Sequence, residues 1–150
     1  MIEVWIDGGC SPNPGPGSWA AYFVRDGGLF EHPFMRAGHE CQTTNNRMEL
    51  RALLDVLEGT AGEVGQIIVH TDSRYVHMGA TEWLFQWVQM GTLEDRANED
   101  LWRKVYNALK YVRVGIRKVG REEVDHVHRL AMKKRYCDKC GHVPCNKGNV

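Results

Sequence analysis

The pattern of apolar and polar positions predicts two β-strands that each end at an acidic residue. Residues 2–7 alternate between aliphatic side chains and others, a period of two that fits a strand with one buried face, and the last of them is Asp7. Residues 66–71 form a short apolar run between a glycine and Asp72. Such a run is typical of a strand buried on both faces in the centre of a sheet with parallel pairing. We therefore expect both acids at strand ends.

A second group of strands is predicted between these two. Residues 12–17 contain three prolines and two glycines, which predicts a loop that is neither helix nor central strand. Residues 19–24 then indicate a strand, residues 26–28 a hairpin turn, and residues 29–37 a third strand. Together with the first strand they predict an antiparallel unit.

From Asn45 the apolar period changes to that of a helix. Four leucines recur at i, i+3, i+4 and i+7, and this helix is expected to end near Gly59. Ser73 and Thr81 are candidate caps of two short helices. The remaining predicted elements are a helix over residues 101–109, a strand over 112–117 and a last helix over 122–135.

The order of these elements predicts an α/β domain, in which an antiparallel hairpin unit is extended by parallel strands and helices lie on the faces of the sheet. At 150 residues the chain has room for one such domain. We place it at residues 1–135 and expect a Cys/His-containing tail over residues 136–150.

Composition limits the class of protein. An apolar content of 43% and a charged content of 25% are ordinary for a globular domain. No apolar run approaches the roughly 18 residues that span a bilayer, and the start of the chain lacks a basic segment followed by an apolar one. Five cysteines, an odd number, argue against a secreted disulfide framework. We therefore expect a cytoplasmic protein with no membrane partner.

The formal net charge of zero hides an uneven distribution. Residues 1–100 carry six Lys and Arg against fifteen Asp and Glu, whereas residues 101–135 carry eleven against three. One interpretation is an ordinary solvated helix surface. The more specific interpretation is an acidic centre beside a basic surface that binds a polyanion.

Three carboxylates are predicted to occupy special places. Asp7 and Asp72 end strands, and Glu49 lies in the first turns of the helix between them in sequence. Each alone could be a solvated acid or a helix cap. Carboxylates that converge repel one another unless a cation neutralises them, so their convergence implies a bound divalent metal.

Five segments occur in an informative order. They are Asp-Gly followed by Asn-Pro-Gly-Pro-Gly within residues 7–17, Thr-Thr-Asn-Asn-Arg-Met-Glu-Leu at 43–50, Thr-Asp-Ser-x-Tyr-Val at 71–76, a Trp-x3-Trp pair at 83–87, and Asn-Glu-Asp-Leu-Trp at 98–102. Together they closely resemble the type 1 ribonuclease H family, over roughly residues 1–135. The resemblance implies a five-stranded mixed sheet flanked by helices. It also implies a metal-dependent endonuclease that hydrolyses the RNA strand of RNA–DNA hybrids and leaves 5′-phosphomonoesters.

The same resemblance implies a set of catalytic, metal-binding acids. Asp7, Glu49 and Asp72 match three of the family's four, which would hold two Mg²⁺ ions, with Mn²⁺ as a substitute. The fourth acid is matched in order by Asp125 in the last helix, with Glu122 or Glu123 as rivals.

The chain departs from the family pattern next to this fourth acid. The family carries a histidine in the loop before the last helix, but residues 120–123 contain none. His126 and His128 are candidates to replace it, and a plain surface position is the alternative for both. His128 also stands where the family has a small residue.

The resemblance further implies contacts with nucleic acid. RNA differs from DNA by its 2′-hydroxyl, which both donates and accepts a hydrogen bond. The positions that match hybrid contacts of the family are Asn13, Asn45, Asn46 and Arg74, and those expected on the DNA side are Thr44 and Asn98. Helix capping is the alternative for Asn45.

The tryptophan pair belongs to a weakly basic region. Trp83 and Trp87 are expected to pack on deoxyriboses, with core packing as the alternative for one of them. Residues 86–100 contain a single base, Arg96, among four acids. This region is therefore predicted to grip phosphate weakly.

The tail contains four candidate ligands for a second metal. Cys137, Cys140, His142 and Cys145 are soft or borderline ligands within nine residues, a composition that suits Zn²⁺. Reduced cysteines in a flexible tail are the alternative.

Two other functions compete with the endonuclease. A catalytically weak or silent hybrid-binding module on the same fold is favoured if a metal acid is lost, and Asp125 decides that point. A related nuclease, such as a resolvase or exonuclease, is disfavoured by the Thr-Thr-Asn-Asn block, which suits 2′-hydroxyls. We expect a monomer whose partner is an RNA–DNA hybrid duplex.

Overall fold

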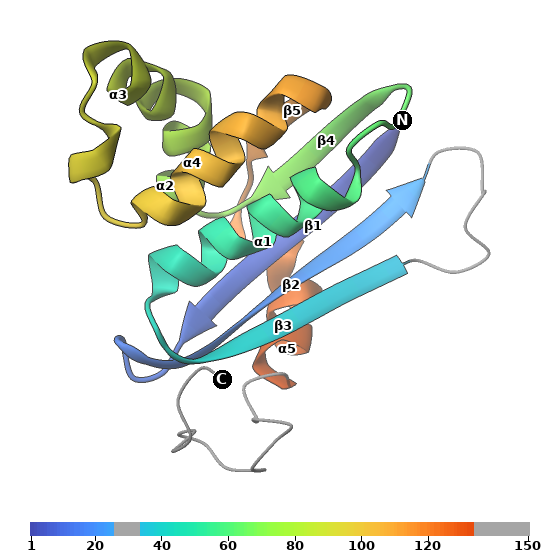
Figure 1. Ribbon diagram of the computed structural model, residues 1–150. Helices are drawn as coiled ribbons and strands as arrows, with labels where there is room; N and C mark the ends of the chain where they lie inside the picture. The colour runs from blue at the N-terminus through green and yellow to red at the C-terminus, as the bar shows by residue number, and fades with distance from the viewer. Residues whose placement is uncertain (26–33, 134–150) are drawn as a thin grey trace.

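The computed structural model describes residues 1–25 and 34–133. They form one mixed sheet in the order β3-β2-β1-β4-β5, as Figure 1 shows. Its strands are β1 (Ile2–Cys10), β2 (Gly15–Arg25), β3 (Phe34–Thr43), β4 (Gln66–Thr71) and β5 (Arg113–Lys118). The pairs β1–β2 and β2–β3 are antiparallel, whereas β1–β4 and β4–β5 are parallel. The predicted α/β fold with a five-stranded mixed sheet is confirmed.

Helices cover both faces of this sheet. α1 (Asn45–Gly59) packs against β1 and lies with α4 (Glu99–Ala108) on one face, and α5 (Asp125–Lys133) packs against β2 and β1 on the other (Figure 1). α2 (Arg74–Met78), a π-helical turn (Gly79–Trp83) and α3 (Leu84–Met90) follow one another after β4. Short 3-10 turns lie at Leu93–Asp95, Leu109–Tyr111 and Arg121–Val124.

The main core lies between α1 and the sheet. Val4 and Ile6 of β1 and Leu53 of α1 are fully buried in one cluster, and a smaller cluster joins Ala20 of β2 to Val127 of α5. Successive side chains of a strand point to opposite faces of the sheet. The alternation that buries Ile6 under α1 therefore turns its neighbour Trp5 toward α5, where Trp5 packs on the smaller cluster.

The Pro/Gly segment is more regular than predicted. β2 begins at Gly15 and lies between β1 and β3, so the expectation that residues 12–17 contain no central strand is wrong for their second half. The pairing of β2 with β3 shifts register between Gly15 and Gly17. Pro16 lies at that irregularity, where a strand tolerates a residue without an amide donor.

Thr81 is not a helix cap. The chain passes from α2 to α3 through the π-helical turn, and the Thr81 hydroxyl donates to the carbonyl oxygen of His77 at 2.6 Å. Gly79, the first residue of this turn, packs so closely on Trp102 that a Cβ would overlap the indole ring. Thr81 therefore lies inside a helical segment that runs from α2 to α3 without a break.

Other predicted boundaries can be compared directly. The helix over residues 45–59 and the strand over 66–71 are confirmed, and Ser73 caps α2 by accepting from the Val76 amide at 3.1 Å. The third strand extends farther than predicted, to Thr43. The last helix begins at Asp125, after a 3-10 turn rather than at residue 122. The predicted hairpin turn at residues 26–28 lies outside the described residues.

Candidate active site

Three carboxylates converge where the parallel pairing of β1 with β4 ends. Asp72 directly follows β4, as predicted, but Asp7 lies inside β1, which continues to Cys10 beside β2, so the expectation that Asp7 ends its strand is wrong. Asp7, Glu49 and Asp72 each offer one oxygen, and these oxygens lie within 4.8 Å of one another. The register of β1 and β4 pairs Ile6 with Thr71, so the acids that follow these two residues are neighbours. The predicted convergence of the three acids is therefore present in the structure.

A close backbone contact brings the third acid to the other two. A Cβ on Gly8 would lie 2.5 Å from the carbonyl carbon of Met48 and 2.7 Å from its oxygen. Only a residue without a side chain allows β1 and the start of α1 to approach so closely. Because Glu49 follows Met48, this contact sets its carboxylate beside Asp7.

Burial raises the cost of charging this cluster. Asp7 is 1% exposed and Glu49 is 9% exposed. Burial raises the pKa of Glu49 well above its ordinary value, and repulsion by Asp7 and Asp72 raises it further. Burial also raises the pKa of Asp7, against the opposing effect of a hydrogen bond with His128. The metal-free cluster therefore favours a bound proton.

The unpartnered oxygens of the cluster fit a metal ion. Asp7 Oδ1, Glu49 Oε2 and Asp72 Oδ1 are buried and have no hydrogen-bond partner among the described residues. Buried carboxylate oxygens are normally paired or coordinate a metal. An all-oxygen ligand set of this kind suits Mg²⁺ or Mn²⁺.

Two basic side chains contact the outer side of the cluster. His128 Nδ1 lies 2.6 Å from Asp7 Oδ2, and Arg121 Nη1 lies 3.4 Å from Asp72 Oδ2. The sequence offered both residues no strong signal. His128 is not a plain surface residue, since its side chain is 25% exposed and contacts an acid 121 positions away.

The expected fourth acid lies apart from the cluster. Asp125 begins α5 with its side chain 57% exposed, and its Oδ2 pairs with Arg129 Nη2 at 3.0 Å. Its rivals Glu122 and Glu123 are also exposed, on the preceding 3-10 turn. A metal role for Asp125 stays a prediction.

Two of the residues expected at the RNA strand, Asn13 and Asn45, are linked to the end of β1, whereas a third, Arg74, lies over Trp83. Asn45 Oδ1 accepts from the Cys10 amide at 2.8 Å, and Asn13 Oδ1 accepts from the Asn45 amide at 3.3 Å. The capping role weighed for Asn45 belongs to Thr44, whose hydroxyl accepts from the Arg47 amide at 3.2 Å. Asn45 is thus free of the capping role.

A second group of expected contacts surrounds the tyrosine of α2. Asn98 Nδ2 donates to Tyr75 Oη at 3.1 Å, and Trp102 Nε1 donates to the same oxygen at 2.8 Å. Asn98 has a φ of 62°, an uncommon conformation for a residue other than glycine. Arg47 also links Asn98 to Asp100, at 3.4 and 3.0 Å. This network joins the start of α1 to the start of α4.

The tryptophan pair carries two arginines. The guanidinium of Arg74 lies 5.9 Å from the ring centre of Trp83, and that of Arg96 lies 5.1 Å from Trp87. Trp87 also packs edge-on against the buried Trp102, so it combines core packing with partial exposure. Arg96 is thus held in place despite its acidic neighbours in sequence.

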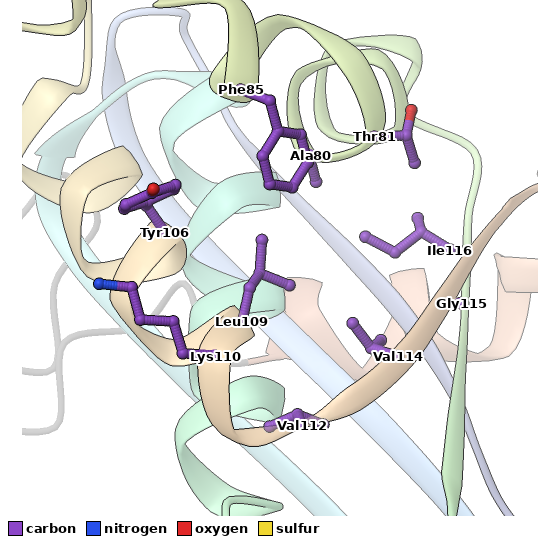
Figure 2. Close-up of a pocket in the computed structure, with 10 residues that line it drawn as sticks. All are labelled: Ala80, Thr81, Phe85, Tyr106, Leu109, Lys110, Val112, Val114, Gly115 and Ile116. Carbon is purple, nitrogen blue, oxygen red and sulfur yellow. The ribbon is translucent and has the colours of Figure 1, made fainter. Parts of the chain in front are cut away.

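An apolar pocket of about 510 Å³ lies elsewhere, along the edge strand β5. Figure 2 shows Phe85, Leu109 and Ile116 among the side chains around it. None of the three clustered acids lines this pocket. The acid cluster therefore lies outside this cavity.

Two further expectations concern segments beyond the site. The candidate zinc ligands Cys137, Cys140, His142 and Cys145 lie outside the described residues. Within residues 1–25 and 34–133, no helix combines the length and apolar character that membrane crossing demands.

Comparison with known proteins agrees with this geometry. The RNase H family model matches residues 1–125. The chain is 42% identical over 113 residues to the Ribonuclease H of Novosphingobium aromaticivorans, covering 73% of this chain and 76% of that protein. It is 45% identical over 111 residues to the Ribonuclease H of Xanthomonas campestris, covering 71% of each.

Solved structures show the same fold. RNase H1 from Halobacterium salinarum is similar with a TM-score of 0.67 and 26% identity, covering 89% of this chain and 96% of that one. LC11-RNase H1, solved in complex with an RNA/DNA hybrid, gives a TM-score of 0.69 at 20% identity, covering 89% and 95%.

Sheet order and acid cluster together define a metal-dependent nuclease of the ribonuclease H-like fold. The chain belongs to the ribonuclease H family. The prediction of a ribonuclease H, an enzyme that acts on RNA–DNA hybrids, is confirmed at this level.

Proposed function

We propose that the chain is an endonuclease that hydrolyses the RNA strand of RNA–DNA hybrids with two Mg²⁺ ions, leaving 5′-phosphomonoesters. The observation that carries the proposal is the set of unpartnered, buried oxygens on Asp7, Glu49 and Asp72. Mn²⁺ is expected to substitute, because it accepts the same oxygen ligands. Asp125 is proposed as the fourth acid.

The chain's own residues prepare the site for this reaction. When bound, the divalent ions activate water and neutralise charge on the attacking and leaving oxygens. The sheet fixes Asp7 and Asp72 in register, and the Gly8 contact fixes Glu49. Because Asp7 lies on a paired strand, Asp72 directly follows one and Glu49 lies on a helix packed against the sheet, the scissile phosphate would meet a preorganised charge distribution.

Recognition of RNA is proposed to come from Asn13, Asn45, Asn46 and Arg74. Side-chain amides can both donate to and accept from a 2′-hydroxyl, which DNA lacks. Asn13 and Asn45 are tied to each other and to β1, close in sequence to the acid on that strand. The RNA strand would therefore be read beside the site that cuts it.

The DNA strand is proposed to lie along Thr44, Asn98 and the tryptophan pair. Trp83 and Trp87 offer partly exposed rings for deoxyriboses, and Arg74 and Arg96 lie over these rings. Guanidinium groups held on aromatic rings can contact phosphate without a large entropy cost. We expect this face to bind phosphate better than its composition indicates.

A cleavage assay tests the proposal. End-labelled RNA–DNA, RNA–RNA and DNA–DNA duplexes are incubated with the protein in Mg²⁺ and in chelator. We expect cuts only in the RNA of the hybrid, and only with metal. Hybrid binding without any cleavage would support the silent binding module instead.

The expectations on oligomeric state, localisation, domain bounds and zinc stay predictions. We expect a monomeric, cytoplasmic protein with a catalytic domain over residues 1–135 and a tail over 136–150. Zinc in the tail is tested by metal analysis of the chain against a variant with Cys137, Cys140 and Cys145 replaced by serine.

A further inference from the structure

The carboxylates of the cluster have two chemically different sides. Asp7 and Asp72 each keep one oxygen without a partner, Oδ1 in both, while the other oxygen meets a basic side chain. Asp7, Glu49 and Asp72 together offer one ligand set to a single ion, and we take the unpartnered oxygens, with Glu49 Oε2, as that set. The second oxygens of Asp7 and Asp72 are already engaged.

The two basic side chains act as one group. Arg121 Nη2 lies 3.4 Å from both ring nitrogens of His128, so the guanidinium spans from Asp72 to the imidazole. His128 in turn contacts Asp7 at 2.6 Å. We call Arg121 and His128 the clamp. Because Asp7 is 1% exposed, its contact with the clamp is little weakened by water.

A second ion would meet this clamp. Beyond the unpartnered oxygens, the ligands proposed for this second ion are Asp7 Oδ2 and Asp125, the predicted fourth acid. Asp125 lies three residues before His128 in α5, a spacing that puts both on one helix face. Asp125 itself is held by Arg129 at 3.0 Å. Basic side chains thus engage both carboxylates that a second ion requires.

We propose that the clamp keeps the second divalent ion out of the free protein. One ion binds at the unpartnered oxygens and leaves the clamp in place. The second binds only when Arg121 and His128 leave Asp7 and Asp72. Both are positioning residues in this role, because they act through the metal ligands. The inference rests on the proposed two-ion function.

Metal stoichiometry of the free protein tests this. Mn²⁺ alone, without nucleic acid, is titrated into the full chain and bound ions are counted by electron paramagnetic resonance. We expect one bound ion for the natural sequence. We expect two for the variant Arg121→Gln/His128→Ala.

A matched control removes the same residue types elsewhere. Arg113 lies at the opposite end of β5 from the acids, and His126 packs on Tyr22. Arg113→Gln/His126→Ala should still bind one ion. Adding Asp125→Asn to the clamp variant should return the count from two to one, because Asp125 is then no longer a ligand.

Several outcomes would overturn the inference. They are two ions in the natural sequence, one ion in the clamp variant, or two ions in the variant that also lacks Asp125. A second double variant, Arg121→Met/His128→Gln, which keeps side chains of similar size, must also gain the second ion, so poor folding of the first double variant cannot hide a negative result. Hybrid cleavage by the natural sequence is scored separately, and its absence would defeat the proposed function without changing the ion count.

Discussion

The backbone of Gly8 in β1 lies directly against the carbonyl group of Met48 in α1, with no room for a side chain between them. This contact joins the strand that carries one acid of the cluster to the helix that carries another. The position of Glu49 therefore depends on a residue that has no side chain of its own.

The first prediction follows from this contact. Gly8→Ala should push the start of α1 away from β1 and reduce kcat by about 10²-fold, the loss that a displacement of roughly 1 Å produces in a catalytic site. Steady-state cleavage of a labelled hybrid measures it. Gly115→Ala in β5 is the control, because its Cβ would meet only the ends of two flexible side chains, Ile68 at 3.3 Å and Gln66 at 3.8 Å. Equal activity of the two variants would show that α1 can shift without harm.

A second prediction concerns the charge of the cluster. Asp72→Asn should lower cleavage by about 10³-fold or more, because a metal ligand is lost. In chelator the same variant should be more stable than the natural sequence by on the order of 1 kcal/mol, since one repulsive charge is gone. Urea denaturation measures the stability.

Two comparisons sharpen this prediction. Asp7→Asn should lose as much activity but gain less stability, because it also gives up the contact with His128. The exposed Asp95→Asn should change neither quantity. A stable, fully active Asp72→Asn would remove that acid from the site.

The third prediction is a pH dependence of stability. Because the pKa of Glu49 is raised in the folded protein, the folded state binds the proton more tightly than the unfolded state. The contribution of Glu49 to the stability of the metal-free protein should therefore be fully present below the ordinary carboxyl pKa, and be lost as pH rises through the raised value. The substitution Glu49→Gln should remove the part of this pH-dependent loss of stability that Glu49 causes.

The measurement compares the two proteins in chelator, by urea denaturation between about pH 5 and about pH 8. The natural sequence should lose more free energy of unfolding across this range than Glu49→Gln. Part of the slope should survive in the variant, because the pKa of Asp7 is also raised. Parallel curves would mean that Glu49 is charged without penalty.

The fourth prediction tests the remaining acid. Asp125→Asn should cost at least about ten times more activity than Glu122→Gln or Glu123→Gln, because it alone is proposed as a metal ligand. Rates at saturating Mg²⁺ provide the measurement. A larger loss from either glutamate would place the fourth ligand on the 3-10 turn before α5 instead.

Elements with a clear period were predicted almost residue by residue, whereas features set by tertiary contacts were not. The helix over residues 45–59 and the strand over 66–71 carry their periodicity in their own side chains. The close packing of Gly79, the first residue of the π-helical turn, on Trp102 joins two residues that are far apart in sequence. No local pattern could show that contact.

The candidate site divides in the same way. The three clustered acids lie in motifs that are recognisable locally, so their convergence followed from strand ends and resemblance. The clamp could not be predicted from the sequence, because Arg121 and His128 contact acids that lie 49 and 121 residues away. Their role depends on how α5 and the turn before it are seated on the sheet.

The acids come from β1, the start of α1 and the end of β4, so no single segment of the chain carries the cluster. The ligand set exists only after β1 and β4 have paired across the intervening helix. A divalent ion therefore stabilises the completed arrangement and not the species that precede it. Under these conditions a bound ion slows unfolding and leaves the rate of folding nearly unchanged. We therefore expect that an ion bound for hydrolysis also lowers the rate at which the protein unfolds.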